Sequence, residues 1–204
     1  MNNELTNKIQ NRKKANDKIY TPIDLAKIMI DLCEIKNNDI VLDPCRGKGA
    51  FYNNLPICKK HYCEIDENKD FFDWDKKVDL IIGNPPYSLW NKWIEHTMKY
   101  CNKFCYIFGY LNFMPERIDL ILNEGFKIKK MILCKVAWWF GQSIIVLFEK
   151  NYNGKIEFNN IRDRFQCDIC NKKCYRGLLR GRGKDRRKYG MNECSNIKHS
   201  KEPS

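Results

Sequence analysis

The sequence has no long apolar run, few histidines and fewer acidic than basic side chains. Among its 204 residues, no stretch approaches the roughly 18 consecutive apolar residues that a membrane-spanning helix needs. The opening residues, MNNELTNKIQNRKK, contain no apolar segment of the kind that a secretion signal requires. There is no internal repeat and no coiled-coil pattern. The sequence therefore predicts a soluble, cytoplasmic protein with no membrane partner.

Cysteine is abundant, and its interpretation depends on the missing secretion signal. Eleven cysteines in a small secreted protein would suggest a disulfide framework. In a protein that stays in the cytoplasm, reduced thiols are expected instead, and some of them can hold a metal ion.

The basic excess is unevenly distributed along the chain. The net charge is +12, and residues 151–204 carry 14 Lys or Arg against 6 Asp or Glu. The last quarter of the chain thus holds two thirds of the excess. A clustered positive field attracts polyanions and is typical of a nucleic-acid surface. The plainer alternative is a lysine-rich face that only contacts solvent.

Apolar spacing predicts alternating helices and strands. The first helix is expected over residues 21–35, with Thr21 as N-cap and Pro22 in the first helical position. Further strands are expected at 39–43, 60–66, 78–83, 103–111, 126–136 and 143–150, and further helices at 49–55, 88–100 and 115–125. This alternation implies βαβ units and a mostly parallel sheet. The last two strands have no helix between them, so we expect them to pair antiparallel at one edge.

Several residues at the ends of these strands suit ligand binding, because α/β sheets bind ligands beyond the carboxyl ends of their strands. In DPCRGKGAF (43–51), Gly47 and Gly49 allow close approach of the backbone to a ligand. Glu64 lies 21 positions after Asp43, near the roughly 20-residue offset at which a carboxylate reaches ribose hydroxyls. The alternatives are an ordinary tight turn for the glycines and a turn cap for Glu64.

The stretch DLIIGNPPYSLW (79–90) ends an apolar run in Asn84-Pro85-Pro86-Tyr87. Two prolines cannot continue a strand ladder, because each lacks an N–H and has a fixed φ. The strand is therefore expected to end in a rigid strand-to-helix turn, from which one amide and one phenol project.

These motifs together resemble a known family. TP (21–22), DPCRGKGAF, CEID, DFFDW and NPPY occur in the order and at about the spacings of S-adenosylmethionine-dependent N6-adenine DNA methyltransferases, over residues 20–150. The resemblance implies a class I methyltransferase-like, Rossmann-type α/β fold, mostly parallel with an antiparallel edge hairpin. The methyl donor would be S-adenosyl-L-methionine. Its methionine part would be flanked by Tyr20, Thr21 and Pro22, its centre by Asp43, Gly47, Gly49 and Asn84, its ribose by Glu64, and its adenine by Asp70 and Phe71.

The resemblance also assigns the catalytic turn. The Asn84 side-chain oxygen and the Pro85 carbonyl would accept the two N–H groups of the target amine. Pro86 would stiffen the turn, and Tyr87 would stack on the extruded base. Phe140, in Trp138-Trp139-Phe140, resembles a further aromatic against the target base. Adjacent tryptophans equally suit a core or a partner surface.

The end of the chain departs from the family, whose members usually carry a sizeable target-recognition domain after the catalytic one. We expect a methyltransferase domain over 1–158 and a small basic Cys/His-rich appendage over 159–204. Arg180 and Arg182 suit phosphate contact. The candidate ligands of a structural Zn²⁺ are Cys167, Cys170, Cys194 and His199, with Cys174 as the alternative to one of them. A disordered basic tail with incidental thiols is the competing interpretation.

The expected reaction is methylation of the N6 amine of adenine in DNA, with a partner subunit as a source of sequence specificity. Asn-Pro-Pro-Tyr also occurs in methyltransferases that modify ribosomal RNA amines or a glutamine amide of release factors. The basic tail favours nucleic acid over protein, and DNA is favoured over RNA. A non-catalytic nucleic-acid-binding module is the alternative from a different class.

Overall fold

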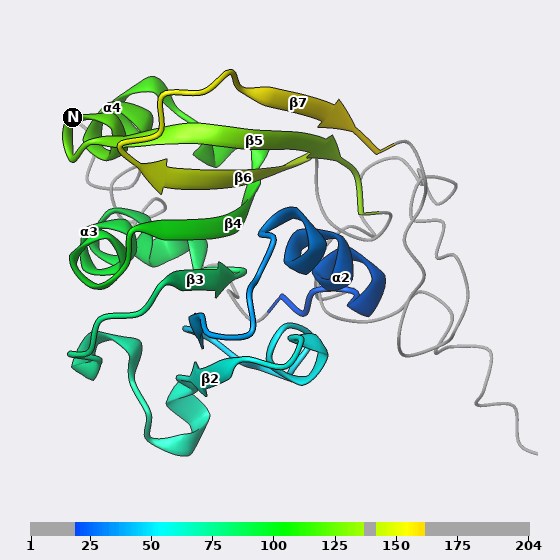
Figure 1. The fold of residues 1–204 in the computed structure, drawn as a ribbon, viewed down its shortest axis with the longest axis vertical. Coiled ribbons are helices and arrows are strands. Elements are labelled where there is room, and N and C mark those ends of the chain that lie inside the picture. The colour runs from blue at the N-terminus through cyan, green and yellow to red at the C-terminus, as the bar shows by residue number, and fades with distance from the viewer. Residues whose placement is uncertain (1–18, 137–141, 162–204) are drawn as a thin grey trace, which may run out of the picture.

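A computed structural model describes residues 19–136 and 142–161, which form one mixed sheet with helices on both faces (Figure 1). The strand order is β2-β1-β3-β4-β6-β5-β7. The strands are β1 (Ile40–Asp43), β2 (Lys59–Tyr62), β3 (Leu80–Gly83), β4 (Lys103–Gly109), β5 (Phe126–Cys134), β6 (Ser143–Lys150) and β7 (Glu157–Asn160). The helices are α2 (Ile23–Leu32), α3 (Trp90–Tyr100) and α4 (Pro115–Asn123).

All strands except β6 run in the same direction. The pairings of β1 with β2 and β3, of β3 with β4, and of β5 with β7 are parallel, whereas β6 is antiparallel to both β4 and β5. The carboxyl ends of the parallel strands therefore lie on one side, to the right in Figure 1. We call this side the carboxyl end of the sheet, and Asp43, Gly83 and Gly109 all lie there.

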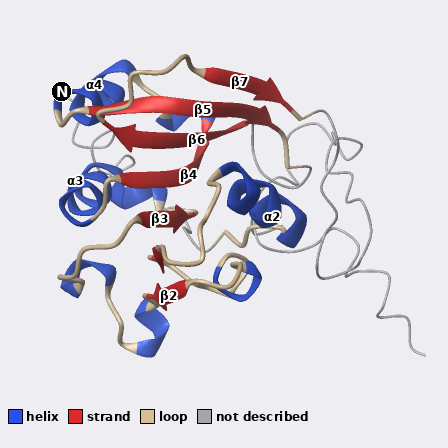
Figure 2. Cartoon of the chain, viewed as in Figure 1, coloured by secondary structure: helices blue, strands red, loops and turns tan. Residues whose placement is uncertain are grey.

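Helices cover both faces of the sheet (Figure 2). Alternating side chains along the strands build an apolar layer on each face. On one face, Leu25 and Met29 of α2 pack with Val41. On the other, Trp90 and Trp93 of α3 are buried and form its packing face. No helix in the part of the chain that the structure describes has the length and apolar content needed to cross a bilayer.

The mostly parallel α/β sheet and the antiparallel pairing of residues 126–136 with 143–150 are confirmed. Two local predictions are wrong. Residues 49–55 form only a 3-10 turn, η1 (Tyr52–Asn54), because Pro56 holds Leu55 in an extended conformation that ends any helix. The first helix begins at Ile23 with Pro22 as its N-cap, and Thr21 does not cap it, since ψ of Pro22 is 141° and lies outside the helical region.

The antiparallel pair does not form the edge of the described sheet. β6 lies between β4 and β5, and β7 pairs parallel with β5 on its other side. The β7 sequence, Glu-Phe-Asn-Asn, is exposed throughout and has no alternating apolar pattern. Its attachment depends on backbone pairing and on Lys130, which forms ion pairs with Glu34 and, at 3.7 Å, with Glu157.

Candidate functional site

The loop after β1 is organised by the buried carboxylate of Asp43. Its Oδ1 accepts a hydrogen bond from the backbone N–H of Cys45 at 3.3 Å, and its Oδ2 accepts one from Tyr52 at 3.2 Å. The carboxylate thus joins both ends of the loop. Gly47 and Gly49 have φ values of +52° and +83°, which side chains with a Cβ rarely adopt, so both glycines are needed by the turn itself.

Glu64 and Tyr20 meet this loop at Gly47. Glu64 Oε2 accepts a hydrogen bond from the Gly47 N–H at 2.6 Å, and its Oε1 accepts one from Asp66 at 3.2 Å. The Tyr20 ring lies 3.4 Å from the position that a Cβ on Gly47 would occupy. The structure therefore brings together Tyr20, Gly47 and Glu64, which the family resemblance assigns to one cofactor. Thr21, the next residue after Tyr20, is buried.

Asn84 follows β3 at the carboxyl end of the sheet, where the two prolines were predicted to end the strand. Its Nδ2 donates a hydrogen bond to the Ile19 carbonyl at 3.1 Å, which orients the amide. Its Oδ1 is buried and has no hydrogen-bond partner. Within the described residues only Arg46 Nε and Trp90 Nε1 share that state. A buried acceptor without a partner is costly, so the Asn84 oxygen is a strong candidate for ligand contact.

A second contact joins Asn84 to the loop after β1. The Cys45 thiol donates a hydrogen bond to the Asn84 carbonyl at 3.2 Å. Gly83 permits this approach, because a Cβ there would lie 3.2 Å from Pro44 Cδ and 3.6 Å from Cys45 Sγ. Sequence reasoning missed Ile19, Cys45 and Gly83 as supports of the site. Only Gly83 carried a signal, as a glycine at the end of a buried strand.

Tyr87 lies in the 3-10 turn η4 (Tyr87–Leu89), which Pro86 precedes as N-cap. Its hydroxyl donates a hydrogen bond to the Ile107 carbonyl of β4 at 3.4 Å, and its ring lies close to Gly109 at the end of that strand. The turn is thus supported by the neighbouring strand, and the Asn84-Pro85-Pro86-Tyr87 segment connects β3 to α3 without a flexible linker.

Asp70 and Phe71 are placed less favourably for the role that the resemblance implies. Asp70 Oδ1 accepts a hydrogen bond from the Phe72 N–H at 2.9 Å and so caps the turn η3 (Phe71–Asp73). The Phe71 ring is buried against Trp93 and His96, with centroids 4.5 and 4.8 Å away. The Phe71 ring thus belongs to the core in this structure, and its assignment to the adenine of the cofactor stays a prediction.

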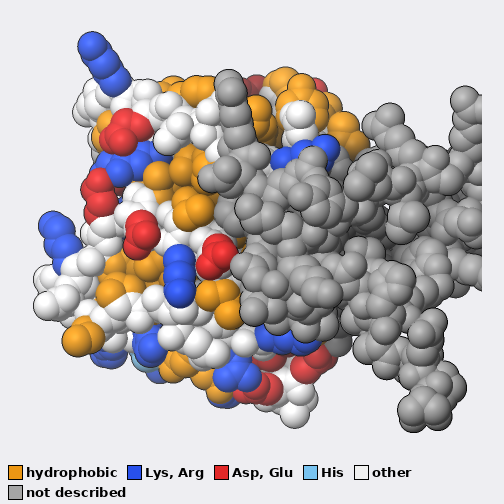
Figure 3. Space-filling view, turned by 90° about the vertical axis from the view of Figure 1, so that its right-hand side faces the viewer, with side chains coloured by type: hydrophobic (Ala, Val, Ile, Leu, Met, Phe, Trp, Pro, Cys, Tyr) orange, Lys and Arg blue, Asp and Glu red, His pale blue; other side chains and the backbone are white. Residues whose placement is uncertain are grey.

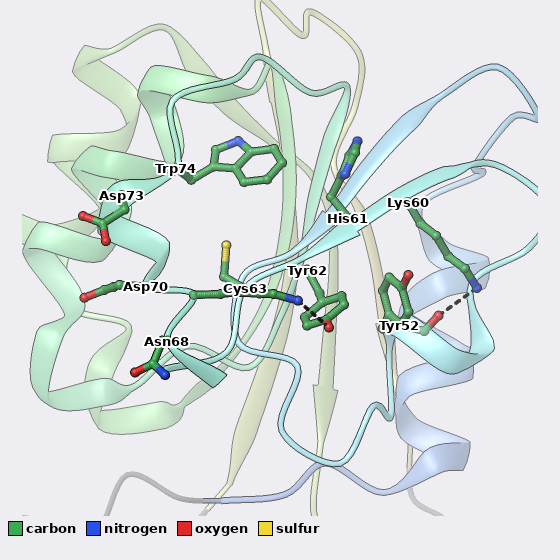
Figure 4. A pocket seen from close by; sticks show the side chains of 10 residues that line it. Tyr52, Lys60, His61, Tyr62, Cys63, Asn68, Asp70, Asp73 and Trp74 are labelled. Atoms are coloured by element: carbon green, nitrogen blue, oxygen red, sulfur yellow. Dashed lines mark hydrogen bonds between the residues drawn. The ribbon is translucent and has the colours of Figure 1, made fainter. Parts of the chain in front are cut away.

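A cavity of about 430 Å³ lies beside β2 (Figure 4). Asn68, Asp70 and Asp73 line one side, and Tyr52 and Lys60 line the other. None of Gly47, Glu64 and Asn84 lines it, so the cavity borders the cofactor residues only through Asp70. The geometry at the carboxyl end of the sheet, with its unpartnered amide oxygen, defines the candidate site better than this cavity does.

Several sequence-predicted residues lie outside the described ranges. They are Phe140, Arg180, Arg182 and the candidate metal ligands Cys167, Cys170, Cys174, Cys194 and His199. Within residues 19–136 and 142–161, no group of three or more His, Cys, Asp or Glu side chains could hold a metal ion.

Burial makes Asp43 sensitive to pH. Desolvation of the fully buried carboxyl raises its pKa from 3.8 to about 7, against the lowering effect of the hydrogen bonds from Cys45 and Tyr52. In the unfolded chain the group ionises near its ordinary pKa, so between about pH 4 and pH 7 the folded state binds more protons than the unfolded state. Stability is then lost as pH rises through this window.

We expect the free energy of unfolding of the wild type, relative to Asp43→Asn, to fall by about 2–3 kcal/mol between pH 5 and pH 8. The asparagine amide does not titrate, so any fixed cost of the substitution is the same at each pH and cancels. Urea unfolding of both proteins at several pH values measures the difference. A constant difference across this range would show that Asp43 does not titrate as its burial implies.

The fold defined by this sheet is that of class I methyltransferases. A protein assigned as an RNA methyltransferase from Pyrococcus horikoshii matches with a TM-score of 0.51 and 17% identity, over 63% of this chain and 82% of that one. A modification subunit assigned to a type I restriction enzyme of Vibrio vulnificus YJ016 matches with a TM-score of 0.53 and 12% identity, over 84% of this chain and 52% of that one. At these identities the likeness concerns the fold alone.

The sequence comparisons are more specific. Residues 4–69 match the family model N-6 DNA Methylase. The type II methyltransferases M.HincII and M.HindII of Haemophilus influenzae are each 31% identical over 126 residues, covering 48% of this chain and 25% and 24% of theirs. The match thus spans about a quarter of the length of these curated relatives. These matches confirm the resemblance to N6-adenine DNA methyltransferases that the motifs indicated.

Proposed function

We propose that this protein transfers a methyl group from S-adenosylmethionine to the exocyclic N6 amine of adenine in DNA. The observation that carries the proposal is the buried, unpartnered Oδ1 of Asn84, in an amide whose other end is fixed by Ile19. An acceptor held in this way at the carboxyl end of an α/β sheet is ready to receive an N–H from a ligand.

The chemistry needs such an acceptor. The amine nitrogen of adenine is a weak nucleophile, because its lone pair is delocalised into the ring. When Asn84 Oδ1 and the Pro85 carbonyl each accept one N–H, the nitrogen can pyramidalise and direct its lone pair at the methyl carbon. The bound donor would supply the methyl carbon, with its thioether as the leaving group when the N–C bond forms, and the extra proton on nitrogen would pass to water. Positioning therefore supplies most of the rate.

The residues of the site suit the methyl donor. Glu64 has carboxylate oxygens beside Gly47 that can also accept from ribose hydroxyls, and Tyr20 lies against the same glycine. Asp43 and Gly49 shape the loop that follows β1. Thr21 and Pro22 connect Tyr20 to α2. When bound, S-adenosylmethionine supplies an activated methyl group on its sulfonium. The role of the chain is to orient this methyl group toward the space beside Asn84.

The net charge of the chain and the family model that it matches both favour nucleic acid as the methyl acceptor. The chain carries a net charge of +12, and the matched family model is named for DNA methylation. We further propose that residues 159–204, including Arg180 and Arg182, contact the phosphate backbone, with Zn²⁺ as a structural ion held by the Cys/His ligands named above. A separate subunit would supply sequence specificity.

The proposal is tested by incubating the full chain with radiolabelled methyl donor and separate pools of DNA, RNA and protein. We expect label in DNA, recovered as N6-methyladenine after digestion and chromatography. A parallel reaction with excess demethylated donor should suppress the signal and shows that transfer depends on the donor site. Label in RNA alone or in protein alone would reject DNA as the acceptor.

A further inference from the structure

Large apolar side chains are exposed in the turn that follows β4. Tyr110 and Leu111, in the 3-10 turn η5 (Tyr110–Asn112), are 59% and 72% exposed. Met114 and Leu89, in the segments that follow β4 and β3, are also exposed. Figure 3 looks onto the carboxyl end of the sheet and shows hydrophobic side chains at the surface among charged ones. Tyr110 and Leu111 are adjacent, exposed apolar residues in one turn at the end of the sheet that carries the candidate site, and such a feature indicates a contact surface.

The turn η5 is held firmly at both ends. The Tyr110 N–H donates to the Gln142 carbonyl at 2.9 Å, and the Phe113 N–H donates to the Tyr110 carbonyl at 3.2 Å. Arg117 Nη1 donates to Asn112 Oδ1 at 2.7 Å. Because the backbone is fixed by these contacts, the exposure of Tyr110 and Leu111 is a built feature of the turn.

The same turn adjoins the predicted catalytic segment. Gly83, which precedes Asn84, pairs with Tyr106 in β4, and β4 continues past this pair to Gly109. Residues 84–87 therefore leave β3 beside the last residues of β4, and Tyr87 reaches Ile107 and Gly109 there. A Cβ on Gly109 would lie 3.9 Å from Tyr87 Cε2 and 3.4 Å from Asn112 Nδ2. The Tyr87 ring and Asn112 of η5 therefore both lie close to Gly109. A base that stacked on Tyr87 would lie near this turn.

We propose that Tyr110 and Leu111 form an apolar prong that enters the base stack of duplex DNA and fills the space vacated by the extruded adenine. The inference rests on the proposed function. An adenine inside a duplex cannot reach Asn84 until it leaves the stack, which costs a few kcal/mol. Apolar side chains that insert between base steps offset this cost, and η5 itself carries no charged side chain that would oppose insertion.

The test compares one long adenine-containing DNA supplied as duplex and as heat-denatured single strands. In Leu111→Ala and Tyr110→Ala we expect the methylation rate on duplex to fall about 10–100-fold, as the loss of a few kcal/mol of stabilisation implies. The rate on single strands should stay within about twofold of the wild type, because no base has to leave a stack. The matched control is Ile57→Ala, which truncates an exposed apolar side chain in the loop before β2.

The outcomes separate this inference from the proposed function. Equal losses on duplex and single strands, or unchanged rates on both, would overturn the prong while leaving the methyltransferase proposal intact. Unchanged rates would point instead to a protein partner for this surface. A wild type that methylates only single strands would reject the prong. A wild type that methylates neither form of DNA would reject both the prong and the proposed function.

Discussion

Replacing Asn84 by alanine is expected to lower the rate of methyl transfer about 10²–10³-fold, the range found when one preorganised hydrogen-bond partner of a reacting group is removed. The substitution deletes the unpartnered Oδ1 and the hydrogen bond from Nδ2 to Ile19. Affinity for S-adenosylmethionine should change only a few fold, because the loop around Gly47 is supported by Asp43 and Glu64. Single-turnover rates and calorimetric titration of the donor measure the two effects separately.

Asn91→Ala is the matched control, since Asn91 is an exposed asparagine in the first turn of α3, seven residues further along. It should leave both the rate and the donor affinity unchanged. If Asn84→Ala transferred methyl groups as fast as the wild type, the turn after β3 would not be the catalytic segment. A variant that lost donor binding entirely would instead assign Asn84 to cofactor binding.

Replacing Phe104 by alanine is expected to lower the free energy of unfolding by about 3–5 kcal/mol, the usual cost of deleting a buried aromatic ring. Phe104 is fully buried in the middle of the sheet. Its ring stacks on Phe148 at a centroid distance of 4.9 Å and lies 5.3 Å from Phe126 and 5.4 Å from Tyr106. β4 also supports Tyr87 and η5, so a destabilised β4 should disturb the candidate site as well. Urea unfolding followed by circular dichroism measures it.

Two further variants serve as controls for the loss of unfolding free energy in Phe104→Ala. Phe104→Leu keeps most of the apolar volume and should cost less than the alanine substitution. Phe158→Ala removes a ring that is exposed on β7, and it should change the free energy of unfolding by less than about 0.5 kcal/mol. If Phe104→Ala cost no more than Phe158→Ala, the aromatic layer under α3 would not be the stabilising core that the packing indicates.

The sequence predicted the features that local chemistry determines. Pro85 and Pro86 cannot take part in a strand ladder, so the end of β3 could be placed before Asn84 to within a residue. The alternation of helices and strands indicated the parallel sheet. Gly47 and Gly49 lie in the loop after the first strand, as predicted, and their positive φ values fit the tight-turn alternative, whereas close approach to a ligand stays a prediction. In each case the decisive property belongs to the residue itself.

The features that the sequence did not reveal depend on residues far apart in the chain. Ile19 orients the Asn84 amide from 65 positions away, and no local pattern indicates that a backbone carbonyl there has this role. Phe71 and Phe72 are adjacent phenylalanines, and only packing against Trp93 and His96 decides that the Phe71 ring is buried. β7 escaped prediction because backbone pairing with β5 holds it and its exposed side chains show no pattern.

The parallel course of β7 has a consequence for whatever follows it. Since β7 runs in the same direction as β3, Asn160 at its end lies on the same side of the molecule as Asn84, and the chain continues from there. Groups joined by a short tether to such a point act at an effective concentration on the order of millimolar. The lysines and arginines that directly follow residue 161 in the sequence would therefore meet a polyanion bound near Asn84, the proposed catalytic residue, at a higher effective concentration than the same peptide added separately.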